Sequence, residues 1–194
     1  MRTESRWGIV VATLGGAIGC GEAPASEAPV ANYFAASNGG RVIAASRMGS
    51  PEKLIDGSES EGSGTSFGEA DRVGATVSVD VETARTVTAT AFRLRAAHDD
   101  GATLFRRAIS GFRLEADRDG DGSFEAPVFE RTVPTNYALV PGNAIGAKVT
   151  ELDLTIHFSP VTARRWRFSA TQGVSTSSPF DGPRIREIEL YARP

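Results

Sequence analysis

Residues 35–194 are predicted to form one all-β domain, a single jelly-roll β-sandwich of about eight antiparallel strands. Two observations carry this prediction. Short runs of alternating apolar and polar residues recur along this part of the chain, and Gly, Asp, Asn and Pro separate them, as in half-buried strands joined by turns. The clearest runs are residues 75–81, 86–95, 109–116, 151–158, 165–170 and 185–192.

The alternation also predicts which side chains face the core. In residues 165–170, Trp166 and Phe168 share one face, and Arg165 and Arg167 point the opposite way, toward solvent. We therefore expect both rings in the core.

The last run contains two carboxylates. Strict alternation divides the residues of this strand between its two faces. One face carries Ile185, Glu187, Glu189 and Tyr191, and the other carries Arg186, Ile188, Leu190 and Ala192. The only helical turn that we expect lies at residues 51–56, with Ser50 as its N-cap.

The length of 194 residues suits one domain with a sizeable core. A composition of 40% apolar and 23% charged residues is ordinary for a globular protein. No basic face with interleaved aromatic residues is visible, so we expect no nucleic-acid partner. The oligomeric state stays open.

The first 19 residues are predicted to be a signal peptide. Arg2 and Arg6 precede an apolar run at residues 7–18, which is too short to span a bilayer and has the length of a signal-peptide core. We expect this segment to be removed when the protein is secreted.

The run ends in Ala17-Ile18-Gly19-Cys20, which resembles a bacterial lipobox. The resemblance implies that Cys20 is lipidated and becomes the mature N-terminus of an outer-membrane lipoprotein of the cell envelope, touching the membrane through its lipid alone. Residues 20–34, rich in Ala, Pro, Glu and Ser, would then be a flexible tether. A secreted protein cleaved nearby, or a buried free thiol, are the alternatives.

Several segments follow one another in an order that resembles the discoidin-type domain, the coagulation-factor C-type and galactose-binding-like family. The resemblance covers most of residues 36–194. The segments are Pro51-Glu52-Lys53-Leu54-Ile55-Asp56-Gly57, Thr65-Ser66-Phe67, Val77-Ser78-Val79-Asp80-Val81, Ile109-Ser110-Gly111-Phe112-Arg113-Leu114-Glu115, Asp119-Gly120-Asp121-Gly122-Ser123-Phe124, Ala163-Arg164-Arg165-Trp166-Arg167-Phe168 and Ile185-Arg186-Glu187-Ile188-Glu189-Leu190-Tyr191. Three residues depart from the family pattern. Glu82 replaces a Gly, and Phe67 and Phe124 replace tryptophans.

The resemblance implies a structural calcium ion near the early Asp-Gly turn, with an acid from the closing strand. Asp56 and Glu187 match those positions, and Thr65 could add an oxygen. Alternatively, Asp56 caps the turn and Glu187 pairs with an arginine.

A second calcium candidate comes from the spacing of acids. Asp117, Asp119 and Asp121 alternate and a glycine follows, which resembles the first half of an EF-hand loop. Val128 stands at the twelfth position, where such a loop needs a Glu. The alternative is an acidic hairpin turn.

We do not expect an enzyme. The two histidines, His98 and His157, lie in no recognisable nucleophile or metal motif, and His157 is expected to be exposed or structural. No Gly-x-Ser-x-Gly, phosphate-loop or His-Glu-x-x-His motif is present. The acids Asp99 and Asp100 are adjacent, which is not the opposed geometry of glycoside hydrolysis.

A sugar site is predicted in the loop at residues 96–108. His98, Phe105, Arg106 and Arg107 combine an aromatic face with hydrogen-bonding groups. A solvated polar loop is the alternative. Together, these features predict a non-catalytic extracytoplasmic module that binds a glycan or another surface polymer. A structural or protein-protein interaction domain without a sugar site is the alternative function.

Overall fold

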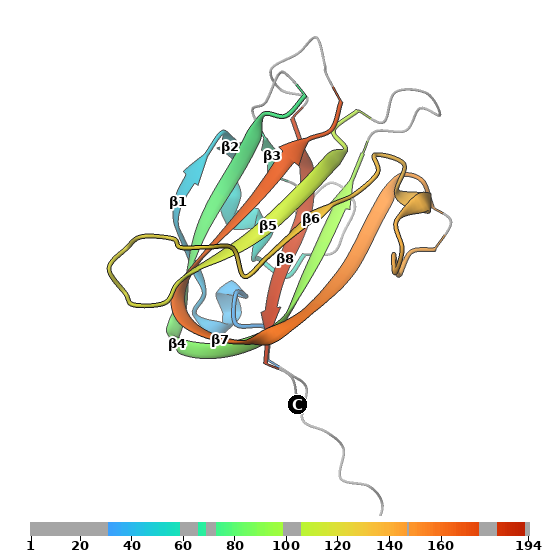
Figure 1. Ribbon diagram of the computed structural model, residues 1–194. Helices are drawn as coiled ribbons and strands as arrows, with labels where there is room; N and C mark the ends of the chain where they lie inside the picture. Colours follow the sequence, from blue (N-terminus) through green and yellow to red (C-terminus); the bar gives the residue numbers. More distant parts are fainter. Residues whose placement is uncertain are drawn as a thin grey trace, which may run out of the picture.

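The computed structural model describes residues 31–58, 66–68, 73–98, 106–146, 148–174 and 182–192. In these ranges the chain forms an all-β sandwich, as predicted (Figure 1). Its strands are β1 (Arg41–Ser46), β2 (Met48–Gly49), β3 (Ser66–Gly68), β4 (Thr76–Ala97), β5 (Ile109–Asp117), β6 (Phe129–Thr132), β7 (Glu151–Gln172) and β8 (Arg184–Tyr191). Its helices are short 3-10 turns: η1 (Ala36–Asn38), η2 (Pro51–Leu54) and η3 (Tyr137–Leu139). None of the helices in the described ranges has the length and apolar character to span a bilayer.

Strands β4 and β7 build both layers of the sandwich. Each is 22 residues long, and they pair antiparallel along most of their length. Their register shifts between Glu82 and Val87, where the paired strands bend sharply (Figure 1). The predicted strands at 75–81 and 86–95 are therefore two halves of one strand, because β4 continues through the bend beside β7.

We call the two layers sheet one and sheet two. Sheet one contains β1, the first half of β4, the second half of β7, β5 and β6. Sheet two contains the first half of β7, the second half of β4, β8, β3 and β2. The turn of β4 and β7, at residues 83–87 and 159–165, forms the bend end of the domain, and residues 98, 106–108, 148–150 and 173–174 lie at the opposite loop end.

Aromatic rings fill the space between the sheets. Phe92 of β4 stacks on Phe168 of β7, with ring centroids 5.6 Å apart and an interplanar angle of 22°. Phe112 meets Phe129 edge-on, with centroids 6.0 Å apart. Trp166 is also fully buried, so the predicted inward face of this strand is confirmed.

Strand β8 does not keep the strict alternation that we expected. Arg95 pairs with Glu187 and Ala96 pairs with Ile185, so Arg186 is the extra residue of a β-bulge. The bulge lets Ile185 enter the same core as Ile188, although strict alternation placed them on opposite faces.

The chain enters the domain beside the end of β8. The side-chain Oδ1 of Asn32 accepts hydrogen bonds from the backbone nitrogens of Phe34 and Leu190, each over 3.0 Å. Phe34, which we placed at the end of the tether, is 0% exposed and belongs to the core. The packed part of the chain thus includes the residues just before position 35.

The predicted helical turn is present as η2, but Ser50 does not cap it. Ser50 adopts a left-handed backbone conformation, with φ of 52°, and its side chain makes no capping hydrogen bond. Pro51 instead occupies the first turn, where its missing N–H and fixed φ suit a helix start.

Candidate functional site

His98, the predicted sugar contact, is buried at the loop end with only 3% of its surface exposed. Its backbone nitrogen donates to the carbonyl of Thr150 over 3.0 Å, and its Nε2 hydrogen-bonds the carbonyl of Val149. Its ring lies 5.1 Å from that of Tyr137. This placement differs from the exposed rim position that we expected, because Val149 and Tyr137 contact the side chain. The other histidine, His157, is exposed on β7.

Tyr137 is a structural residue of this end that the sequence did not single out. Its hydroxyl oxygen accepts a hydrogen bond from the backbone nitrogen of Ile109 over 2.9 Å, and its burial raises the pKa of the phenol. The side chain of Asn136 caps the turn that carries it, accepting from the nitrogen of Ala138 over 3.1 Å. Tyr137 thus fixes the start of β5 beneath the loop end.

The two arginines of the predicted site lie differently. Arg106 is exposed, whereas Arg107 is half-buried and has a positive φ of 68°. The carbonyl of Arg107 accepts from the nitrogen of Arg184 over 3.0 Å, which joins this loop to the start of β8. Phe105 lies outside the described residues. Among the described members of the predicted set, Arg106 is the exposed one.

The early turn and the closing strand meet, as the resemblance implied. The backbone nitrogen of Gly57 donates to Oε1 of Glu187 over 3.3 Å, and Glu187 is only 1% exposed. Asp56 is exposed, and its Oδ1 accepts from the nitrogen of Ser58 over 2.8 Å, so it does cap the turn. Thr65 lies outside the described residues. The calcium ion at this place stays a prediction.

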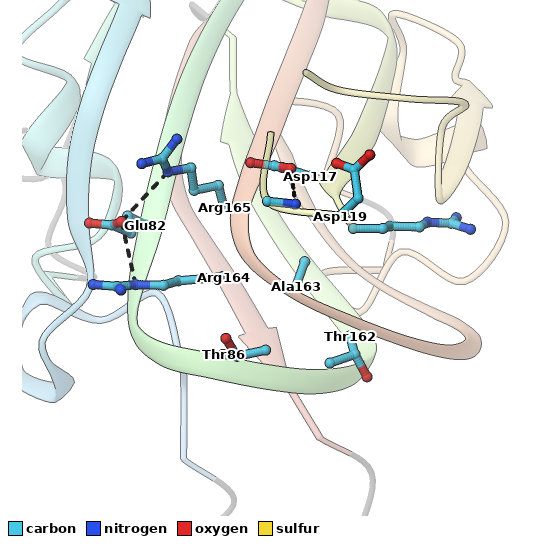
Figure 2. Close-up of a pocket in the computed structure, with 10 residues that line it drawn as sticks. Glu82, Thr86, Asp117, Asp119, Thr162, Ala163, Arg164 and Arg165 are labelled. Carbon is cyan, nitrogen blue, oxygen red and sulfur yellow. Dashed lines mark hydrogen bonds and ion pairs between the residues drawn. The ribbon is translucent and has the colours of Figure 1, made fainter. Parts of the chain in front are cut away.

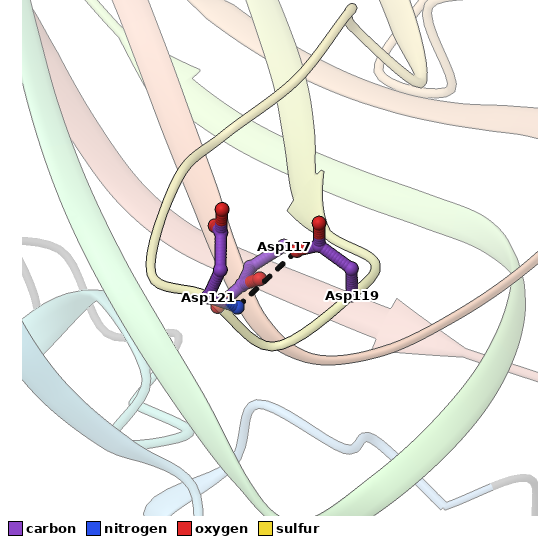
Figure 3. Close-up of side chains that lie close together, drawn as sticks. All are labelled: Asp117, Asp119 and Asp121. Carbon is purple, nitrogen blue, oxygen red and sulfur yellow. Dashed lines mark hydrogen bonds between the residues drawn. The ribbon is translucent and has the colours of Figure 1, made fainter.

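The acids of the second calcium candidate converge where β5 ends, at Asp117 and in the loop that follows it (Figure 3). Ligand oxygens of Asp117, Asp119 and Asp121 all lie within 4.8 Å of one another. Asp117 is buried, and its two oxygens accept from the nitrogens of Gly120, over 2.8 Å, and Gly122, over 3.1 Å. An all-oxygen set suits calcium, while the same hydrogen bonds describe a self-capped acidic turn. Calcium binding at this loop stays a prediction.

Two further details describe this loop. The backbone N–H of Ser123 donates to Asp121 and lowers the pKa of its carboxyl. Val128 packs against the core, and its nitrogen donates to the carbonyl of Leu114 over 2.7 Å. The residue at the twelfth position of an EF-hand loop is therefore packed against the core, directly before β6.

A hollow of about 320 Å³ lies between this loop and the bend end (Figure 2). Glu82 at its wall is buried and contacts Arg164 over 3.4 Å and Arg165 over 3.6 Å, and it also pairs with Arg41. The hydrogen bond from Arg41, aided by the other two charges, lowers the pKa of Glu82. The residue that replaces the expected Gly is thus an acid surrounded by arginines.

A scan of protein families finds no match to the sequence, and a search of curated proteins also finds none. Solved structures do match the fold. One is the family 32 carbohydrate-binding module of Streptococcus pneumoniae EndoD, with a TM-score of 0.54 and 17% identity over 84% of this chain and 100% of that one. Another is the family 32 module of C. perfringens NanJ in complex with galactose, with a TM-score of 0.55 and 17% identity over 82% of this chain and 98% of that one.

The chain has the discoidin-like fold of these modules. Allantoicase of Saccharomyces cerevisiae also shares the fold, with a TM-score of 0.59 and 10% identity over 84% of this chain and 43% of that one. Because all these identities are low, the likeness concerns the fold alone.

On the outer face of sheet one, this discoidin-like sandwich carries a pair of opposite charges on neighbouring strands. Arg167 makes two hydrogen bonds to Asp80, of 2.6 Å and 2.7 Å, and this pairing raises the pKa of the guanidinium. Phe124, which stands where the family has a tryptophan, packs over Arg167 with 4.2 Å from the guanidinium carbon to the ring centroid. The ring of Phe124 therefore covers the guanidinium of Arg167.

Proposed function

We propose that this chain is a non-catalytic module that binds a glycan at its loop end. One observation carries the proposal. The discoidin-like fold matches carbohydrate-binding modules over nearly their whole length, including one solved with galactose. Sites at the loops of a rigid sandwich are a common arrangement in binding domains, because loops tolerate sequence change while the strands hold them.

The proposed contacts at the loop end are Arg106 and Arg107, together with Phe105. A guanidinium group presents several N–H donors in one plane, which suits adjacent sugar hydroxyls. Arg106 is exposed and able to reach a ligand. The buried side chain of His98 contacts Val149 and Tyr137 and so helps to hold the loop in place.

A glycan array followed by isothermal titration tests the proposal. We expect Arg106→Ala to weaken the binding of a glycan identified on the array by about tenfold, the effect of one lost hydrogen bond to a charged group. The matched control is Arg118→Ala, which removes an exposed arginine beside the bend end and should leave the affinity unchanged. Unchanged affinity in Arg106→Ala would contradict the proposed site. Failure of every glycan would favour the structural or protein-interaction alternative.

We also propose that lipid on Cys20 tethers the module to the bacterial cell envelope. The lipobox-like segment before Cys20 supports this step. The full chain should partition into the detergent phase of a Triton X-114 extract, and Cys20→Ala should move it to the aqueous phase. Aqueous partitioning of the unaltered chain would contradict the tether.

A further inference from the structure

The strand pairing of sheet one brings hydroxyl side chains into rows on its outer face. In one row, Thr76 lies opposite Thr171, Thr171 opposite Gly111, and Gly111 opposite Thr132. Because neighbours across paired strands share a face, these residues all point away from the core. The adjacent row consists of Ser46, Ser78, Ser169, Arg113 and Glu130.

Two local features of β5 open a hollow of about 280 Å³ in these rows. Gly111 has no side chain, so the row is interrupted between Thr171 and Thr132. The register also shifts between Ile109 and Gly111, which makes Ser110 the extra residue of a β-bulge. A Cβ at position 111 would lie 3.0 Å from the carbonyl oxygen of Arg131, so this glycine accommodates the close approach of the β6 backbone.

The hollow is lined by groups that both donate and accept hydrogen bonds. Hydroxyl groups come from Thr76, Ser110, Thr132, Ser169 and Thr171. Arg113 stands at the rim with 44% of its side chain exposed, and its Nε lies 3.2 Å from Glu115, which restrains the guanidinium. Glu130 adds an exposed carboxylate. Neighbouring sugar hydroxyls need this mixture of donors and acceptors.

The size of the hollow limits the ligand. Its volume of about 280 Å³ is just below the range of about 300–1,000 Å³ that encloses drug-sized molecules, so it suits one sugar ring. Phe112 borders the hollow only through its backbone side, because its ring is buried in the core. Binding would therefore depend on hydrogen bonds without ring stacking from this residue, which favours a weak contact with one unit of a polymer.

We propose that this hollow on the outer face of sheet one is a second sugar site, which takes one hexopyranose unit through its hydroxyl groups. It lies on the outer face of sheet one, where Ser110 and Thr171 are two positions along their strands from the loop end, and it uses none of the residues proposed there. The inference rests on the proposed function only for the class of ligand. Two weak sites on one rigid domain would increase the avidity for a polysaccharide, provided that both reach the same chain.

Amide chemical shifts in a ¹⁵N-labelled sample test this site directly, with galactose and galacturonate as the probes at about 10 mM, the range of weak single-sugar binding. We expect the amides of Thr76, Gly111 and Thr171 to shift with at least one probe. The double variant Thr76→Val, Thr171→Val keeps the side-chain shape but removes two hydroxyls, and should weaken this response about tenfold. The matched control is Thr155→Val on the exposed face of sheet two, which should respond like the unaltered chain.

Two outcomes would overturn the second site. One is the absence of shifts at these amides with both probes, and the other is an unchanged response in the folded Thr76→Val, Thr171→Val variant. Thermal unfolding of the variant establishes that it is folded. The Arg106→Ala variant separates this inference from the proposed function, because a response of the hollow that persists in it supports the second site whatever the loop end binds.

Discussion

The backbone nitrogen of Gly57 donates a 3.3 Å hydrogen bond to Oε1 of Glu187, across 130 positions of the chain. This bond ties the turn after η2 to the closing strand β8. Glu187 is buried while Gly57 is exposed, so the carboxylate contacts the turn from the interior side. The early turn therefore depends on the last strand for its position.

Removing this carboxylate should destabilise the domain. We expect Glu187→Ala to lower the free energy of unfolding by about 2 kcal/mol, because it leaves a buried site without a charged acceptor. Glu187→Gln keeps one acceptor oxygen and should cost less. Urea denaturation measures both, with the exposed Glu125→Ala as the control. A loss in Glu187→Ala no larger than that in the control would contradict the role given to this bond.

Acid should weaken the bend end through Glu82. Its folded-state pKa is lowered from 4.5, first by the hydrogen bond from Arg41 and then by the nearby charges of Arg164 and Arg165. A lowered pKa gives stability that is complete above the unfolded value and is lost as the pH falls through the folded one. Because 44–68% of each arginine side chain is exposed, water screens part of this effect.

Glu82→Gln tests this pH dependence. The variant should lose less free energy of unfolding than the unaltered chain when the pH falls from about 6 to about 3. Glu125→Gln, an exposed acid in a loop, serves as the control and should keep the original slope. Parallel curves for Glu82→Gln and the unaltered chain would show that Glu82 does not carry the effect.

The buried position of His98 predicts a stability effect. His98→Ala removes the hydrogen bond to Val149 and the ring contact with Tyr137, and we expect a loss of about 2 kcal/mol in the free energy of unfolding. His157→Ala, on the exposed side of β7, should change it by less than about 0.5 kcal/mol. Chemical denaturation compares the two, and equal losses would argue against a structural His98.

Calcium binding is proposed at two places and is testable by unfolding temperature. An ion that binds only the folded state stabilises it by about 2.7 kcal/mol at a concentration of 100 Kd. We therefore expect excess calcium to raise the Tm above that measured with a chelator. Asp119→Ala alters the exposed part of the acidic loop, and Asp56→Ala alters the early turn. The part of the Tm rise that each variant loses shows how much each site contributes. An identical Tm in both conditions would contradict both sites.

The fold could be predicted from the sequence because its evidence is local. The alternation around Trp166 and Phe168 shows directly which side chains enter the core, and the structure buries both. The same reasoning failed at Ile185, because the bulge at Arg186 arises from pairing with Arg95 and Ala96, about 90 positions away. Local periodicity does not reveal such an insertion.

The candidate site was less predictable, because exposure is not a local property. His98 follows a strand and precedes polar residues, which favoured an exposed loop position. In the structure its side chain contacts Val149 and Tyr137, which come from distant parts of the chain. In the sequence, Glu82 stands out only as a departure from a family pattern, and the arginines that surround it come from β1 and β7.

The order of residues predicts where most strands run, which rings face the core and where the three acids of the Asp117 loop alternate. Each of these follows from the two-residue period of a strand or from the spacing of a turn. That Thr76, Thr171 and Gly111 line one hollow is visible only in the folded chain. The register between distant strands sets which side chains become neighbours across a sheet, and no local pattern encodes that register.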